Sequence, residues 1–327
     1  MNFAKRRQFL LATGALLAAP MVEAQPAGKV YRIGWLTLGK PSPSSAYLTE
    51  ALKEGLRELG YVEGRNYAIE ARSAEGKMDR LDAAAAELTG SKVDVIVTNV
   101  NATTHAAKRA TKTIPIVMTV GTDVVEEGFA ASLARPGGNI TGLTWDVGVD
   151  MMAKRFEFLK EAVPKLARVA VLWDPGQDAP GFKRAIEEGG KAAGLKLIWP
   201  EVADDLEPAF AIAVRENAQA LFTGGGNRMF MARKRVVELA AKHRLPDAHY
   251  DSAFVDDGGL MSYAPNLPAL FKGAAKHIDR ILKGAKPGDL PVERPMRIDL
   301  VINLKTARTL GLTIPQSILL RADRVIE

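Results

Sequence analysis

Two sets of alternating strands and helices make up this chain, and a short segment at residues 134–144 separates them. Before the segment, apolar stretches typical of buried strands, such as 30–38 and 93–98, alternate with stretches of helical leucine spacing. After it the same alternation resumes, from a predicted strand at 168–173. Alternation of this kind predicts parallel sheets covered by helices on both faces, so the expected fold class is α/β.

The separating segment has the composition of a boundary. Its Arg-Pro-Gly-Gly-Asn run, residues 135–139, is typical of the end of a helix, here predicted over 124–133. Residues 140–144 are then predicted to form a short strand. We interpret the segment as the first crossover between two lobes that enclose a ligand cleft. The alternative is an ordinary loop inside one large α/β domain.

The predicted lobes are assembled from separate parts of the chain. A length of 327 residues suits about two domains. The tail is expected to cross the interface again, because two lobes joined by several strands hinge more reproducibly than two joined by one. The predicted boundaries are 29–144 with 261–284 for lobe 1, and 145–260 with 291–327 for lobe 2.

The first 24 residues are predicted to be an export signal. Lys5, Arg6 and Arg7 precede an apolar run at 9–22, and the mature chain would begin near Gln25. The run is shorter than the about 20 apolar residues of a permanent membrane anchor. Residues 6–10, Arg-Arg-Gln-Phe-Leu, match the core of a twin-arginine signal. The alternative is a helix of a cytosolic protein.

Composition argues against several classes of function. A net charge of +6 without a long basic run, together with 6% aromatic residues, is unlike a nucleic-acid-binding protein. The chain has no cysteine, so the usual site of bacterial lipid attachment is missing, and a freely soluble periplasmic protein is expected. The four histidines lack metal-ligand spacing, and neither a nucleophile elbow nor a dinucleotide fingerprint is found. We therefore expect no metal, no cofactor and no enzymatic activity.

Polar loops that follow the predicted strands are the candidate ligand site. In an open parallel sheet these loops line the ligand crevice, and helix N-termini there favour a carboxylate. Asp123 or Asp251 could then hold an ammonium group at the other end of the ligand. Trp173 could stack on an aromatic group, or be a core residue at the sheet edge. The candidate ligand-binding residues are Thr37, Ser44, Asn99, Asn101, Thr103, Asp123, Thr144, Trp173, Asp174, Gly225, Asn227 and Asp251. Any one of them alone is more often a plain helix cap.

Several segments resemble one family. Arg135–Thr144 (Arg-Pro-Gly-Gly-Asn-Ile-Thr-Gly-Leu-Thr) is similar to a motif of bacterial ABC-transporter substrate-binding proteins of the tryptophan/tyrosine-type branch. Residues 56–64, 93–97, 258–263 and 301–307 agree with the same family in the same order. The resemblance covers essentially the whole mature chain.

The resemblance implies a type I periplasmic-binding fold, with two Rossmann-like lobes, a hinge of three strands and a ligand closed between them. It also implies two partners, a membrane permease and its ATPase, with the receptor itself a monomer. Asp123 matches the aspartate of an Asp-Pro pair in the family, whereas Asn101-Ala102 replaces Thr-Pro. The expected ligand is an amino acid or an aromatic carboxylate. The alternatives are a sensor that docks a signalling receptor, and an isomerase or hydrolase on the same scaffold.

Overall fold

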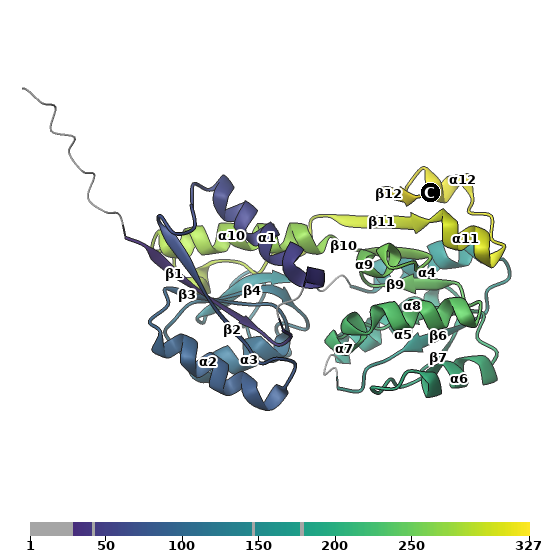
Figure 1. The fold of residues 1–327 in the computed structure, drawn as a ribbon, viewed down its shortest axis with the longest axis horizontal. Helices are drawn as coiled ribbons and strands as arrows, with labels where there is room; N and C mark the ends of the chain where they lie inside the picture. Colours follow the sequence, from purple (N-terminus) through teal and green to yellow (C-terminus); the bar gives the residue numbers. More distant parts are fainter. Residues whose placement is uncertain (1–28, 41–42, 146–147, 177–179) are drawn as a thin grey trace, which may run out of the picture.

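The structure is a computed structural model that describes residues 29–40, 43–145, 148–176 and 180–327. The predicted export signal, residues 1–24, lies outside the described residues. Figure 1 shows two lobes side by side along the longest axis, and each lobe contains a sheet of its own. The predicted two-lobed α/β fold is confirmed, and the alternative of one large domain is wrong.

The first lobe is built on a five-stranded sheet with the order β2-β1-β3-β4-β5, in which every pair is parallel. Its strands are β1 (Tyr31–Thr37), β2 (Tyr67–Ser73), β3 (Val95–Thr98), β4 (Ile116–Gly121) and β5 (Ile140–Thr144). The helices α1 (Pro43–Glu58) and α10 (Leu267–Leu282) pack together on one face, and α2 (Leu81–Gly90) and α3 (Asn101–Ala110) on the other (Figure 1). Short 3₁₀ turns are η1 (Met78–Arg80) and η2 (Pro287–Asp289).

The second lobe is built on a seven-stranded sheet with the order β12-β11-β10-β9-β8-β6-β7. All pairs are parallel except β10 with β11. The strands are β6 (Arg168–Leu172), β7 (Lys196–Ile198), β8 (Ala220–Thr223), β9 (Asp247–His249), β10 (Met261–Pro265), β11 (Ile298–Asn303) and β12 (Arg324–Ile326). The helices are α4 (Gly148–Ala162), α5 (Pro180–Ala192), α6 (Glu207–Arg215), α7 (Asn227–Met231), α8 (Arg233–Lys242), α9 (Ser252–Asp256), α11 (Leu304–Leu310) and α12 (Gln316–Leu319).

Gly142 explains part of the composition of the separating segment. Its φ is +129°, and a Cβ at this position would lie 2.1 Å from the carbonyl oxygen of Met118 on the neighbouring strand. The register between β4 and β5 shifts between Met118 and Gly121. Only glycine allows this close approach of the two strands, because any side chain would collide with backbone atoms.

Three passages of chain connect the lobes. The first runs from the end of β5 to the start of α4, the second joins β10 to α10, and the third leads into β11 (Figure 1). In the second passage Asn266 caps α10, because its side-chain oxygen accepts a hydrogen bond from Ala269 N at 2.8 Å. The second and third passages are linked by a hydrogen bond from Asn266 N to Arg297 O at 3.0 Å. The third is also linked to the end of β5, where Thr144 N donates to Glu293 O at 2.9 Å, so the lobes can move about a shared axis.

Two of the predicted lobe boundaries differ from the structure. Residues 261–265 were assigned to lobe 1, but they form β10, which pairs with β9 and β11 in the second sheet. Residues 292–293 were assigned to lobe 2, but they bond to the first lobe, where Glu293 N donates to Gly142 O at 2.9 Å. The hydrophobic pattern marks a strand but carries no information on which sheet will accept it.

Two element predictions also need correction. The predicted helix over 124–133 is not formed, because Asp123 and Gly128 both have positive φ and turn the chain at each end of residues 124–127. The separating segment therefore follows a series of turns rather than a helix. The strand β9 was missed because it is three residues long and contains an aspartate and a histidine. Gly311 ends α11 in the left-handed conformation, with φ +73°.

Candidate functional site

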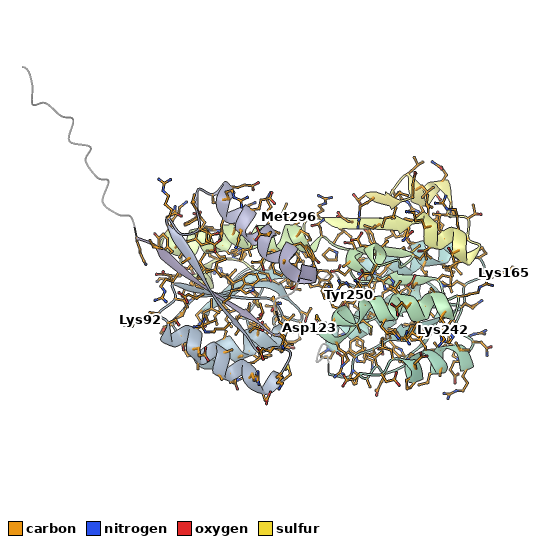
Figure 2. All side chains as sticks on the ribbon, viewed as in Figure 1. Lys92, Asp123, Lys165, Lys242, Tyr250 and Met296 are labelled. Carbon is orange, nitrogen blue, oxygen red and sulfur yellow. The ribbon has the colours of Figure 1, made fainter. Side chains whose placement is uncertain are left out.

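The predicted ligand residues lie at the carboxyl ends of strands or at the starts of the helices that follow. In the first lobe they follow β1, β3, β4 and β5, and Ser44 lies in the first turn of α1. In the second lobe they follow β6, β8 and β9, and Asn227 begins α7. Figure 2 shows Asp123 and Tyr250 on the facing sides of the two lobes. Two of these loops reach the other lobe or a shared pocket, since Asp123 contacts Gly181 of α5 and Asp251 lines a pocket that residues of both lobes form. The contact of any candidate residue with a ligand stays a prediction.

Asn101 holds the loop that carries Asp123. Its side-chain oxygen accepts a hydrogen bond from Thr122 N at 3.0 Å, and its Nδ2 donates to Thr122 O at 2.8 Å. The same Nδ2 donates to Glu127 Oε1 at 3.2 Å, and the other oxygen of Glu127 pairs with His105. The hydrogen bonds of Asn101 therefore fix the start of α3 to the turn after β4.

The threonines of the first lobe bond to nearby backbone atoms. Thr103 Oγ1 donates to Val100 O at 2.7 Å, and Thr144 Oγ1 donates to Gly121 O at 2.8 Å. Both side chains are fully buried. Thr37 is half-buried and donates to Gly39 O at 3.2 Å. Asn99 N donates to Thr103 Oγ1 at 3.3 Å, so this loop is closed on itself. These contacts shape the loops of the first lobe.

Asp123 makes a direct contact between the lobes. Its Oδ2 accepts a hydrogen bond from Gly181 N at 2.9 Å, in the first turn of α5 in the second lobe. Backbone N–H groups in the first turn of a helix have no partner within the helix, and the helix dipole favours a negative charge there. A Cβ on Gly181 would lie 2.2 Å from Asp123 Oδ1, so the contact requires glycine at this position.

Trp173 and Asp174 pack within the second lobe. The Trp173 ring meets Trp199 edge-on with centroids 5.8 Å apart, and Lys183 Nζ lies 5.1 Å from the Trp199 centroid. Asp174 Oδ1 accepts a hydrogen bond from Gly176 N at 3.0 Å and lies 3.5 Å from Arg228 Nε. Trp173 is 7% exposed, which favours a role in the core at the sheet edge over stacking on a ligand.

Gly225 and Gly226 lie between β8 and α7, with φ of +88° and +99°. Their conformation turns the chain into α7, and the carbonyl of Gly226 accepts a hydrogen bond from the Tyr250 hydroxyl at 3.0 Å. Tyr250 is buried, and burial raises its pKa well above the ordinary value of a tyrosine. The tyrosine therefore stays neutral and links the loop after β8 to the loop after β9.

A pocket of about 610 Å³ lies beside the connecting passages and is lined from both lobes. Tyr47 of α1 and the start of α10 contribute from the first lobe. From the second lobe come Arg233, the turn that contains Asp251, and part of β11. This volume is in the range of about 300–1,000 Å³ that is typical of small-molecule sites.

Asp251 is the most unusual side chain of this pocket. It is 3% exposed and caps α9, since its Oδ1 accepts a hydrogen bond from Ala253 N at 2.7 Å. Its Oδ2 is buried and has no hydrogen-bond partner among the described residues. Burial raises the pKa of Asp251 to about 6, although the Ala253 N–H and the Arg233 charge oppose that rise. A carboxylate with one unsatisfied buried oxygen is a strong acceptor for a ligand donor.

Arg233 and Tyr47 line the same pocket and were not predicted. Burial and the charge of Asp251 raise the pKa of Tyr47. A sequence signal existed, since Val236, Val237 and Ala240 lie three, four and seven residues later and are buried, which puts Arg233 on the apolar face of α8.

Two parallel α/β lobes joined by three passages, with a pocket lined from both, define the class of type I periplasmic binding proteins. The sequence model of the family described as "ABC transporter substrate binding protein" matches residues 41–326. The chain belongs to this family. Its function is therefore that of a solute-binding protein of ABC transport, as the sequence resemblance implied.

Relatives with known names or structures agree with this assignment. A tyrosine-binding protein of Clostridioides difficile is 25% identical over 272 residues, which cover 83% of this chain and 78% of that protein. A conserved domain protein from Vibrio cholerae has a similar structure, with a TM-score of 0.84 and 28% identity over 91% of this chain and 100% of that one. A Streptococcus ABC domain in complex with L-Trp has a TM-score of 0.83 and 27% identity over the same shares.

Proposed function

We propose that this chain is the periplasmic receptor for a small polar organic solute, which it captures between its lobes and delivers to a membrane permease and its ATPase. The pocket at Asp251 carries the proposal, because both lobes line it and a buried carboxylate oxygen there has no partner among the described residues. The names of two relatives, which refer to tyrosine and L-Trp, support an amino-acid-sized solute.

Capture by lobe closure has a physical basis in the interface. A solute that contacts both lobes binds the closed arrangement more tightly than the open one, so it shifts the population toward closure. The hydrogen bond from Gly181 N to Asp123 also forms only when the lobes approach. Solute contacts and this hydrogen bond therefore favour the same state.

Export follows from the family and from the first segment of the chain. Proteins of this family work outside the cytoplasm. Among residues 29–40, 43–145, 148–176 and 180–327, no helix combines the length and apolar character needed to cross a membrane. We propose export into the periplasm by the twin-arginine route, on the basis of residues 6–10, with no lipid anchor on the mature chain.

The receptor is expected to leave its solute chemically unchanged and to act as a monomer. After incubation and release by denaturation, mass spectrometry of the solute should recover the starting compound in full. Recovery of an altered compound would favour an enzyme on the same scaffold.

The oligomeric state is a separate test. Light scattering should give a mass that matches one chain, and a stable dimer would contradict the proposal.

A thermal-shift screen of the mature protein tests the proposal directly. The panel contains the amino acids, their decarboxylated amines and aromatic acids. A ligand at about one hundred times its dissociation constant should raise the free energy of unfolding by about 2.7 kcal/mol, because it binds only the folded state. Small-angle scattering of the hit should show a smaller radius of gyration with ligand than without. A panel without any stabilising compound would count against the receptor.

A further inference from the structure

The pocket beside the connecting passages carries an inference about the class of solute, which rests on the proposed receptor function. We propose that this pocket selects an organic solute whose polar end is a protonated amine without a neighbouring carboxylate, and that Asp251 binds that amine. The solute is thus an organic cation rather than a zwitterion or an acid.

The charges that line the pocket favour a cation. Five aspartates and three arginines line it, so the carboxylates outnumber the guanidinium groups by two. Each arginine already lies beside one of these carboxylates. The pairs are Arg233–Asp257 with Nε and Oδ2 at 2.8 Å, Arg297–Asp299 with Nε and Oδ1 at 2.7 Å, and Arg324–Asp256 with Nη1 and Oδ1 at 2.5 Å.

The two remaining carboxylates are Asp323 and Asp251. Of these two, only Asp251 has a buried oxygen that lacks a hydrogen-bond partner in the described part of the chain. Asp323 Oδ2 accepts a hydrogen bond from Leu300 N at 2.8 Å. Asp251 uses Oδ1 for the cap on α9, and its buried Oδ2 has no partner in the described part of the chain. An isolated acceptor of this kind is costly unless a donor reaches it, and an ammonium group offers three donors together with the opposite charge.

A second charged group on the ligand would be poorly accommodated. The guanidinium groups that could receive a carboxylate are already neutralised by their aspartate partners, and the excess of carboxylates repels another anion. Beside these charged groups the pocket is lined by the apolar side chains of Pro265, Leu267 and Val301 and by the ring of Tyr47, together with Ser252 and Asn266. The pocket therefore suits an amine on an apolar body.

Matched compounds that share one body separate these possibilities. Calorimetry with the mature protein near neutral pH would compare tyramine, tyrosine and 3-(4-hydroxyphenyl)propanoate, which present an amine, a zwitterion and an acid. Tryptamine, tryptophan and indole-3-propanoate, and then pentylamine, 6-aminohexanoate and hexanoate, repeat the comparison on other bodies. In at least one set we expect the amine to bind about tenfold or more tightly than the zwitterion, and the acid not to bind.

The outcomes distinguish the inference from the receptor function. If the zwitterion binds as tightly as its matched amine in every set in which the amine binds, the amine selectivity is overturned while the receptor function stands. Failure of every amine to bind also overturns the inference, whatever else the wider panel finds. Only a complete lack of binding by all classes of compound counts against the receptor itself.

The variant Asp251→Asn tests the proposed anchor. Asparagine is as good a helix cap as aspartate, so α9 should be retained while the charge is removed. Amine affinity should fall about tenfold or more, because a charge-assisted hydrogen bond is lost. The matched control is Asp205→Asn, a residue outside the pocket whose Oδ1 accepts a hydrogen bond from Glu207 N at 3.0 Å. Unchanged amine affinity in a folded Asp251→Asn protein would overturn the assignment.

Discussion

Replacing Gly181 by alanine is expected to weaken solute binding by about 10- to 100-fold while leaving both lobes folded. A Cβ at this position would lie 2.2 Å from Asp123 Oδ1 and 2.8 Å from its Cγ. The Asp123 side chain must then swing away, so the hydrogen bond between the lobes is lost. A hydrogen bond to a charged group contributes about 1.5–3 kcal/mol, which corresponds to this range of affinity.

The effect acts on the closed state rather than on the solute. When the closed arrangement is less populated, the apparent dissociation constant rises in proportion. The solute-bound variant should therefore show a larger radius of gyration by small-angle scattering than the solute-bound natural protein. The control is Gly90→Ala at the end of α2, where no atom lies within 4 Å of the added Cβ.

A double-mutant cycle isolates the contact between Asp123 and Gly181. Asp123 has φ +49°, a conformation that glycine adopts without cost, so Asp123→Gly removes the carboxylate and preserves the backbone. In that background Gly181→Ala should have little further effect, because the group that it displaces is gone. Equal effects of Gly181→Ala in both backgrounds would show that the contact between these two residues does not stabilise closure.

Asp251→Asn is expected to stabilise the folded protein at about pH 7.5 by roughly 1–3 kcal/mol in the absence of solute. Burial raises the pKa of Asp251 to about 6, whereas an aspartate in the unfolded chain titrates near pH 3.9, as is usual. The folded state therefore binds the proton more tightly than the unfolded state. The resulting stability is fully present below about pH 4 and is lost as the pH rises through about 6.

The charged and titratable neighbours of Asp251 set the size of this effect. Arg233 and His249 lower the pKa of Asp251, and Asp256 raises it. Burial, and after it the charge of Asp251, raises the pKa of Tyr47 and of Tyr250, which keeps both neutral in this range. The comparison with Asp251→Asn therefore isolates the contribution of Asp251, because the other groups of the cluster are present in both proteins.

Urea unfolding at about pH 5 and about pH 7.5 checks this expectation. From about pH 5 to about pH 7.5, the free energy of unfolding of the natural protein should decrease more than that of Asp251→Asn. The reason is that only the natural protein loses the stabilising proton on residue 251. Parallel changes in the two proteins would contradict a raised pKa at Asp251. The Asp205→Asn protein should follow the natural protein.

Part of the candidate site was predictable because it depends on local order along the chain. The pattern of polar loops after strands predicts that Asp123, Asp174 and Asp251 lie at the carboxyl edges of parallel sheets. Asp123 follows β4 of the first sheet, and Asp174 and Asp251 follow β6 and β9 of the second, although β9 itself is not predicted. The partners of these carboxylates were not predictable. Asp123 meets Gly181 across the interface, and Asp251 meets a pocket whose wall includes Tyr47, some 200 residues away in sequence.

The sequence by itself determined the two α/β lobes, most of their strands and the family, because hydrophobic periodicity and short motifs are local properties of the chain. The tertiary structure alone decided which sheet accepts residues 261–265 and which lobe accepts residue 293. It also decided that Asp251 keeps one buried oxygen without a partner in the described structure. These outcomes depend on distances between segments far apart in sequence, and on the water that packing removes from a carboxylate. No local pattern contains either quantity.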